Sequence, residues 1–128
     1  MNIRFTARCH ECFVEDEVLI VGFADSKSDP GDYLILQRAE AFDEQDRRLG
    51  MATYYVETAQ PGLAGYGGVE RVELAAGRLR LVFAPATPWC RDLQQVEILL
   101  GPPLDDLDAV ERSLAGIFPD ALPAIIRH

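Results

Sequence analysis

VERVELAAGRLRLVF (Val69–Phe83) is the stretch that decides the kind of fold this chain adopts. On both sides of Ala76-Gly77, hydrophobic residues alternate with charged ones, which is the period of two expected of a half-buried β-strand. We therefore predict a hairpin with arms Val69–Ala75 and Arg78–Phe83. Acidic residues on one arm can face arginines on the other, and each such pair contributes about a few tenths of a kcal/mol.

Further strands are predicted on both sides of this hairpin. Ile3, Phe5, Ala7 and Cys9 alternate with polar residues, which indicates a half-buried strand at the N-terminus. Other segments are rich in β-branched, aromatic or apolar residues and are separated by glycine- and proline-containing turns. They predict strands over Glu17–Ala24, Asp32–Arg38, Thr53–Glu57 and about Leu93–Leu100.

One amphipathic helix is predicted near the C-terminus, with Asp105 as its N-cap and Pro119 as its stop. Its apolar residues form a single stripe that is expected to pack on the sheet: Leu107, Val110, Leu114, Ile117 and Phe118. The expected fold is α+β, in a single domain over 1–128. It comprises a mostly antiparallel sheet of about seven strands (about 2–100), a helix (about 105–118) and a short tail (119–128).

Composition limits the classes of function. The formal net charge of −9 disfavours nucleic-acid binding and favours a basic protein partner, because complementary charge accelerates association. The sequence contains no apolar run of about 18 residues and no secretory signal, so we expect a cytoplasmic protein. Its three cysteines are expected to be free thiols there. An exposed edge strand can pair with a second copy of the chain, so a homodimer is a possible assembly.

The segment CHEC (Cys9–Cys12) has the spacing of a zinc or redox pair. In a strand, however, residues three apart point to opposite faces. We therefore expect Cys9 in the core and His10 on the surface, and no metal or cofactor. A metal-binding module built on Cys9, His10 and Cys12 remains an alternative.

Acidic residues gather in FDEQDRRLGMATYYVE (Phe42–Glu57). A small acid–base enzyme using Asp43, Glu44, Asp46 or Glu57 is a second alternative, and it would need these carboxylates to converge in a cleft. A solvated polar turn that leads into a strand is the simpler interpretation. The glycine-rich GYGG (Gly65–Gly68) leads into a strand rather than a helix, so it predicts a tight turn that exposes Tyr66 and not a phosphate site.

Several blocks, in this order and spacing, resemble the tenth family of immunity proteins in bacterial polymorphic toxin systems. The resemblance covers about residues 2–118 and rests on GFAD (Gly22–Asp25), YLILQR (Tyr33–Arg38), FDEQD (Phe42–Asp46), LGMATYYVE (Leu49–Glu57) and YGGVERVEL (Tyr66–Leu74). It implies a non-catalytic protein that binds and neutralises a cognate toxin. Acidity further suggests a basic, nuclease-type toxin domain as partner.

For the partner-binding surface we select polar or amphipathic residues in or beside turns. Tyr54 and its neighbour Tyr55 must point to opposite faces of their strand, so one of the two tyrosines is expected in the core. The selected residues are Glu44, Gln45, Asp46, Tyr54, Glu57 and Tyr66.

Overall fold

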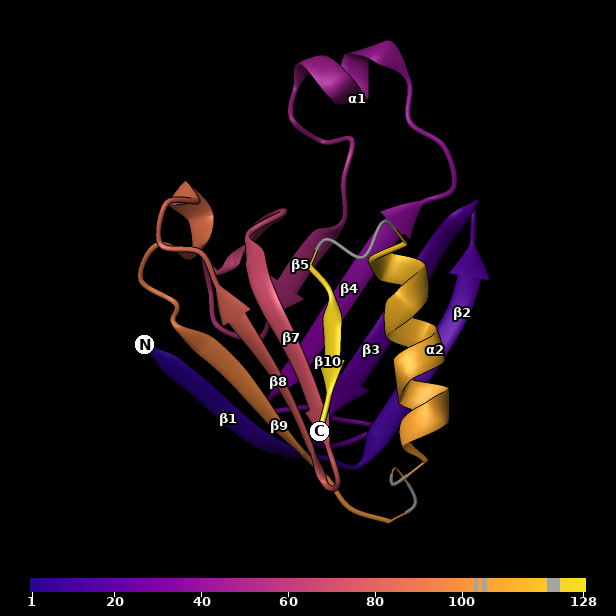
Figure 1. Cartoon of the computed structure of the whole chain (residues 1–128), viewed down its shortest axis with the longest axis vertical. Helices are drawn as coiled ribbons and strands as arrows, with labels where there is room; N and C mark the ends of the chain where they lie inside the picture. The colour runs from indigo at the N-terminus through magenta and orange to yellow at the C-terminus, as the bar shows by residue number, and fades with distance from the viewer. Residues whose placement is uncertain (103, 105, 120–122) are drawn as a thin grey trace.

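Figure 1 shows the computed structural model of the chain, which describes residues 1–102, 104, 106–119 and 123–128. These residues form two five-stranded β-sheets. The first sheet has the order β1-β9-β8-β7-β10, with bounds Asn2–Ala7, Gln95–Leu100, Arg78–Phe83, Val69–Ala75 and Ile125–Arg127. The second has the order β2-β3-β4-β5-β6, with bounds Cys9–Glu15, Val18–Ala24, Tyr33–Ala39, Tyr55–Thr58 and Ala64–Tyr66. The helices are α1 (Glu44–Arg48), the 3₁₀-helix η1 (Pro88–Cys90) and α2 (Leu107–Ile117).

The prediction of one sheet of about seven strands is wrong, because the first predicted strand is divided between two sheets. The backbone bends at Arg8, whose N–H donates to the Ala24 carbonyl at 2.8 Å, and the chain passes from β1 of the first sheet into β2 of the second. The short strands β6 and β10 were also not predicted, and β10 lies in the segment expected to be a tail. The mostly antiparallel character is confirmed, since only the β1–β9 and β10–β7 pairs among the described strands are parallel.

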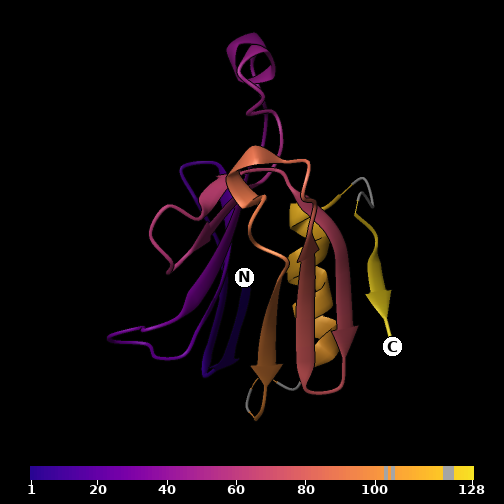
Figure 2. The same cartoon turned by 90° about the vertical axis from the view of Figure 1, so that its left-hand side faces the viewer.

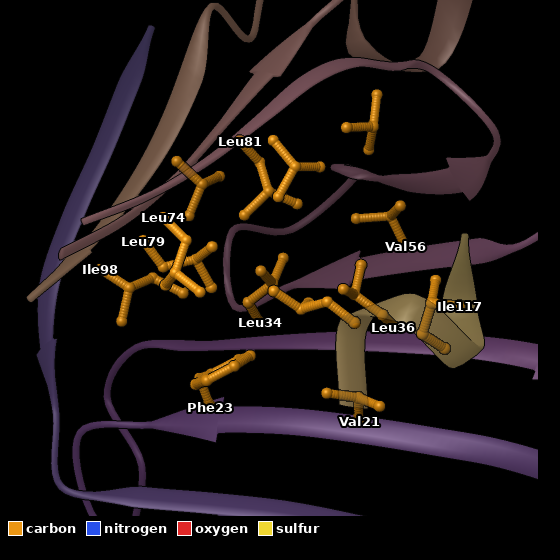
Figure 3. Close-up of a cluster of buried hydrophobic side chains, with 14 of the residues drawn as sticks. Val21, Phe23, Leu34, Leu36, Val56, Leu74, Leu79, Leu81, Ile98 and Ile117 are labelled. Atoms are coloured by element: carbon orange, nitrogen blue, oxygen red, sulfur yellow. The ribbon is translucent and has the colours of Figure 1, made fainter. Parts of the chain in front are cut away.

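The predicted hairpin is confirmed with its bounds, and its apolar positions build one wall of the core. Figure 3 shows Leu74, Leu79 and Leu81 of this hairpin facing Leu34 and Leu36 of the second sheet. All five side chains are fully buried. Each contributes about 1.5–3 kcal/mol of hydrophobic stabilisation, which makes the space between the two sheets the main source of stability.

Helix α2 lies beside the first sheet, in the layer that covers the inner face of the second (Figures 1 and 2). Its N-cap is Asp106, whose side chain accepts from Ala109 N–H at 3.2 Å; Asp105, the predicted cap, lies outside the described residues. The predicted stripe is buried from Val110 to Phe118. Arg38 of β4 donates from Nη1 to the Ile117 carbonyl at 3.2 Å, which binds the last turn of the helix to the second sheet.

Candidate functional site

The outer face of the second sheet is the candidate site. On β3, β4 and β5 the buried residues, such as Val21, Leu36 and Val56, point inward, so the residues between them point outward. Strand register arranges the outward residues in four rows: Cys9–Ala24–Tyr33, Glu11–Gly22–Ile35–Glu57–Ala64, Phe13–Ile20–Gln37–Tyr55–Tyr66 and Glu15–Val18–Ala39. This outer face combines small, aliphatic and aromatic residues with carboxylates at its margins.

A cavity of about 380 Å³ opens on this face above Gly22 and Ala24. Tyr33, Ile35 and the carboxylate-bearing residues Glu11 and Glu57 line it, together with the loop that follows β3. The Tyr33 hydroxyl donates to Glu57 Oε2 at 3.2 Å. Desolvation and the neighbouring Glu57 carboxylate both raise the pKa of Tyr33, so its hydroxyl stays protonated and remains a donor at neutral pH.

The loop after β3 is held in place by one carboxylate. Asp25 accepts from Gly31 N–H at 2.9 Å and from Asp32 N–H at 3.0 Å, which closes the segment into a compact turn. Ser26, Lys27 and Pro30 of this turn form the wall of the cavity at the end of the sheet. The cavity is therefore bounded by local hydrogen bonding as well as by strand packing.

Residues 40–53, which contain α1, form an arm that projects beyond the end of the sheets (Figure 1). Asp43 and Asp46 stabilise it by a capping box: Asp46 N–H donates to Asp43 Oδ1 at 2.7 Å, and Asp43 N–H donates to Asp46 Oδ2 at 3.1 Å. These carboxylates thus cap a helix and do not converge with Glu57. Leu49 is 61% exposed on the arm, which places a large apolar side chain where a partner can reach it.

The arm adjoins the outer face through a second, smaller hollow of about 130 Å³. Phe42 and Asp46 of the arm line it on one side, and Gln37, Tyr55 and Tyr66 line it on the sheet. Tyr55 and Tyr66 pack edge to face, with ring centroids 5.0 Å apart. The arm and the outer face therefore form one continuous surface.

Of the six residues selected from the sequence, five lie on this surface and Tyr54 does not. Glu44, Gln45 and Asp46 lie on α1, Glu57 lines the larger cavity, and Tyr66 is 38% exposed in the aromatic row. These five residues therefore lie on one contiguous surface.

Tyr54 is buried, because its ring packs against Phe118 and its hydroxyl accepts from Val69 N–H at 2.9 Å. Its selection for partner binding is therefore wrong, and its neighbour Tyr55 is the tyrosine that faces outward. Burial is the first cause of the raised pKa of Tyr54.

Sequence reasoning missed the cavity residues Glu11, Gly22, Tyr33 and Ile35. Alternation in Asp32–Arg38 was the available signal, since it places Tyr33 and Ile35 on the face opposite Leu34 and Leu36. It also missed Trp89, whose Nε1 donates to the carbonyls of Tyr66 and Gly67, each at 3.2 Å. Trp89 thereby holds the glycine-rich turn that exposes Tyr66, the conformation expected from GYGG.

The two sheets present outer faces that differ in electrostatic character. On the first sheet, register aligns Arg4, Glu97, Arg80 and Glu73 in a row of alternating charge. Arg4 and Glu97 approach to 2.9 Å, and Arg80 and Glu73 to 2.6 Å. The predicted pairing of acid and arginine across the hairpin is thus confirmed, and this outer face is neutralised internally.

On the second sheet the charged residues in the four rows are Glu11, Glu15 and Glu57, all acidic. Residues 9–66, all of which the structure describes, hold 12 of the 21 Asp and Glu but four of the 12 Lys and Arg. This segment carries −8 of the formal charge of −9. Ion pairs among the described residues involve none of its acids, so its negative charge is uncompensated.

The CHEC segment lies in β2 with Cys9 and Cys12 on opposite faces, as predicted. The expectation of Cys9 in the core and His10 on the surface is wrong: Cys9 lines the outer cavity, whereas His10 stacks on the buried Phe23 and lies 3.2 Å from Ser113 Oγ. The bend at Arg8 shifts the alternation by one residue. In the part of the chain that the structure describes, no three His, Cys, Asp or Glu residues are grouped to hold a metal ion. Nor does a helix of that part have the length and apolarity to cross a membrane.

The chain thus combines a two-sheet scaffold with an acidic and aromatic outer face on its second sheet. Residues 6–108 match the family model described as Immunity protein 10, so the chain belongs to the immunity protein 10 family and the resemblance seen in the sequence is confirmed. Among curated proteins, none matches the chain.

Proposed function

We propose that this chain neutralises a cognate bacterial toxin domain by occlusion, without catalysis, in the cytoplasm of the cell that makes the toxin. Membership of the immunity family supports a toxin partner. The observation that carries the choice of surface is the contrast between the neutralised outer face of the first sheet and the uncompensated acids and tyrosines of the second. The partner surface consists of this outer face and the arm.

The chemistry of the surface favours a basic, nuclease-type toxin domain. Acidic residues steer a basic partner and raise its association rate, whereas buried aromatic anchors supply most of the binding free energy. The proposed contact residues comprise the sequence-selected residues on this surface, the exposed Phe13 and the partly exposed Tyr55. The proposed contact residues are Glu44, Gln45, Asp46, Glu57, Tyr66, Phe13 and Tyr55.

Co-expression with the toxic domain encoded by the neighbouring gene tests this function. We expect the chain to restore growth and to co-purify with that domain; a chain that does neither is not its immunity protein. The choice of surface is tested by the double substitution Glu15→Lys/Glu44→Lys, which should reduce the association rate about tenfold at low salt.

Glu70→Lys/Asp92→Lys is the matched control, because it changes the net charge equally at two exposed positions outside the outer face and the arm. We expect the control to reduce the association rate much less. Equal reductions in the two variants would show that net charge alone, and not this surface, governs association.

A further inference from the structure

We propose that the cavity above Gly22 receives one arginine side chain of the partner, an inference that rests on the proposed function for the identity of that partner. The first support is the glycine itself. Glycine weakens the interior of a strand relative to alanine, and in strands it often marks a bulge or the close approach of a ligand.

Neither the backbone nor the packing requires glycine at position 22. The pairing of β3 with β2 and with β4 continues through Gly22 without a bulge, and its φ lies outside the left-handed region. A Cβ at this position would meet nothing closer than the Leu34 carbonyl oxygen at 4.0 Å. The remaining reason for glycine here is the open space above it, which the side chain of another residue would fill.

The walls of the cavity suit a guanidinium group. Glu11 and Glu57 lie in the same row as Gly22, and the two strands that carry Gly22 and Ile35 separate them, so they provide carboxylates on both sides of the floor. Tyr33 provides an aromatic ring and, through its hydrogen bond to Oε2, orients Glu57 and leaves Oε1 as a further acceptor. A planar guanidinium stacks on an aromatic ring and donates to carboxylates in one plane, and its aliphatic stem can pack on Ile35.

Size and charge lead to the same occupant. A cavity of about 380 Å³ lies at the small end of the range for ligand sites, so it accommodates one long side chain rather than a helix or strand. The cavity belongs to the segment with a net charge of −8, which favours a cation. Among the described residues that line it, Lys27, an exposed residue of the loop wall, is the one basic residue, and its charge opposes the binding of a cation.

The test is a titration of the free protein, followed by amide NMR shifts at constant ionic strength, with butylguanidinium and with its neutral isostere butylurea. Butylguanidinium should give saturable shifts around Gly22, Tyr33 and Ile35, and butylurea should not. Glu57→Gln should weaken binding about fivefold, a loss typical of one charged contact. Glu70→Gln, on the first sheet, is the matched control and should leave it unchanged.

Two further variants separate binding from folding. Gly22→Val fills the floor of the cavity with a residue that strands favour, so it should abolish butylguanidinium binding while the melting temperature stays the same or rises. Lys27→Ala removes the opposing charge and should strengthen binding about two- to fivefold. If Gly22→Val fails to fold, the other two variants still test the site, because Glu57→Gln should weaken butylguanidinium binding and Lys27→Ala should strengthen it.

Equal shifts with butylurea, or shifts spread over all acidic residues without saturation, would overturn the arginine site. That failure is distinguishable from failure of the proposed function: growth rescue by the unaltered chain would persist in the first case and be absent in the second. With the toxin, Gly22→Val should weaken binding at least tenfold, and unchanged affinity would also overturn the inference.

Discussion

Tyr54 and Tyr55 are adjacent residues whose mutation should have opposite effects, because one faces the core and the other the outer face of the second sheet. In Tyr54→Phe, the buried N–H of Val69 loses the hydroxyl oxygen to which it donates at 2.9 Å. The second hydrogen bond, from the hydroxyl to the Val69 carbonyl at 3.4 Å, is long and contributes less. An unsatisfied buried donor costs about 1–3 kcal/mol.

For a chain of 128 residues, 1 kcal/mol corresponds to a shift in Tm of about 4 °C, so Tyr54→Phe should lower Tm by about 4–11 °C. Tyr55→Phe is the matched control, with the same atom removed from a partly exposed residue, and should change Tm by less than about 2 °C. Toxin binding should show the reverse order. Tyr55→Ala, which removes the outward ring, should weaken toxin binding, whereas Tyr54→Phe should leave the affinity of the folded protein unchanged. A stable Tyr54→Phe with weakened toxin binding would refute the assignment of the two faces.

Three further outcomes follow from individual contacts. In Gly65→Ala the new Cβ would overlap the Trp89 ring, so the unfolding free energy should fall by about 1–3 kcal/mol, and Trp89→Leu should restore part of it in the double variant. Burial lowers the pKa of His10 from 6.5, so the unfolded chain binds more protons and stability should decrease as the pH falls from 7 to 5; chemical denaturation of His10→Gln should show a smaller decrease. The edge strand β2 carries Glu11 and Glu15, which repel a second copy, so sedimentation at neutral pH should show a monomer.

Local periodicity was sufficient for the elements whose two faces differ strongly in polarity. Two kinds of element were predicted in this way: the hairpin arms Val69–Ala75 and Arg78–Phe83, and the helix stripe from Val110 to Phe118. Apolar residues recur there with the regular period of a strand and of a helix, respectively. The three-residue strands β6 and β10 contain too few residues to show a period. Pairing with longer neighbours, rather than their own sequence, makes them strands.

The division into two sheets was not predictable from alternation, because it depends on one residue. Before the bend at Arg8, Ala7 points into the core. Regular alternation would place Cys9 inward next, but after the bend His10 is the residue that points inward. Alternation likewise restricted Tyr54 and Tyr55 to opposite faces without deciding between them. The decision comes from the pairing of Val56 with Leu36, since it places Val56 in the core and Tyr55 outside.

For the candidate site, the acidic arm could be predicted but the cavity could not. Glu44, Gln45 and Asp46 are recognisable as a polar segment in one short stretch, whereas Glu11, Gly22, Ile35 and Glu57 come from four strands and become neighbours only through register. The uneven charge was countable in the sequence, since −8 lies within residues 9–66. That these charges belong to one sheet could be recognised only from the strand pairing.

The difference between the two outer faces also predicts how the proposed inhibition responds to polyanions. A basic partner that approaches the first sheet must displace Arg80 from Glu73, at 2.6 Å, and Arg4 from Glu97, at 2.9 Å. On the second sheet it displaces solvent alone, so association there is favoured. Under this proposal, the cationic residues of the toxin that contact the sheet are those that would otherwise bind phosphate. Heparin should therefore compete with the immunity protein for the toxin. The apparent Kd of the complex between immunity protein and toxin should rise linearly with heparin concentration. An apparent Kd that is independent of heparin would show that the toxin is bound away from its basic surface and would refute occlusion by charge.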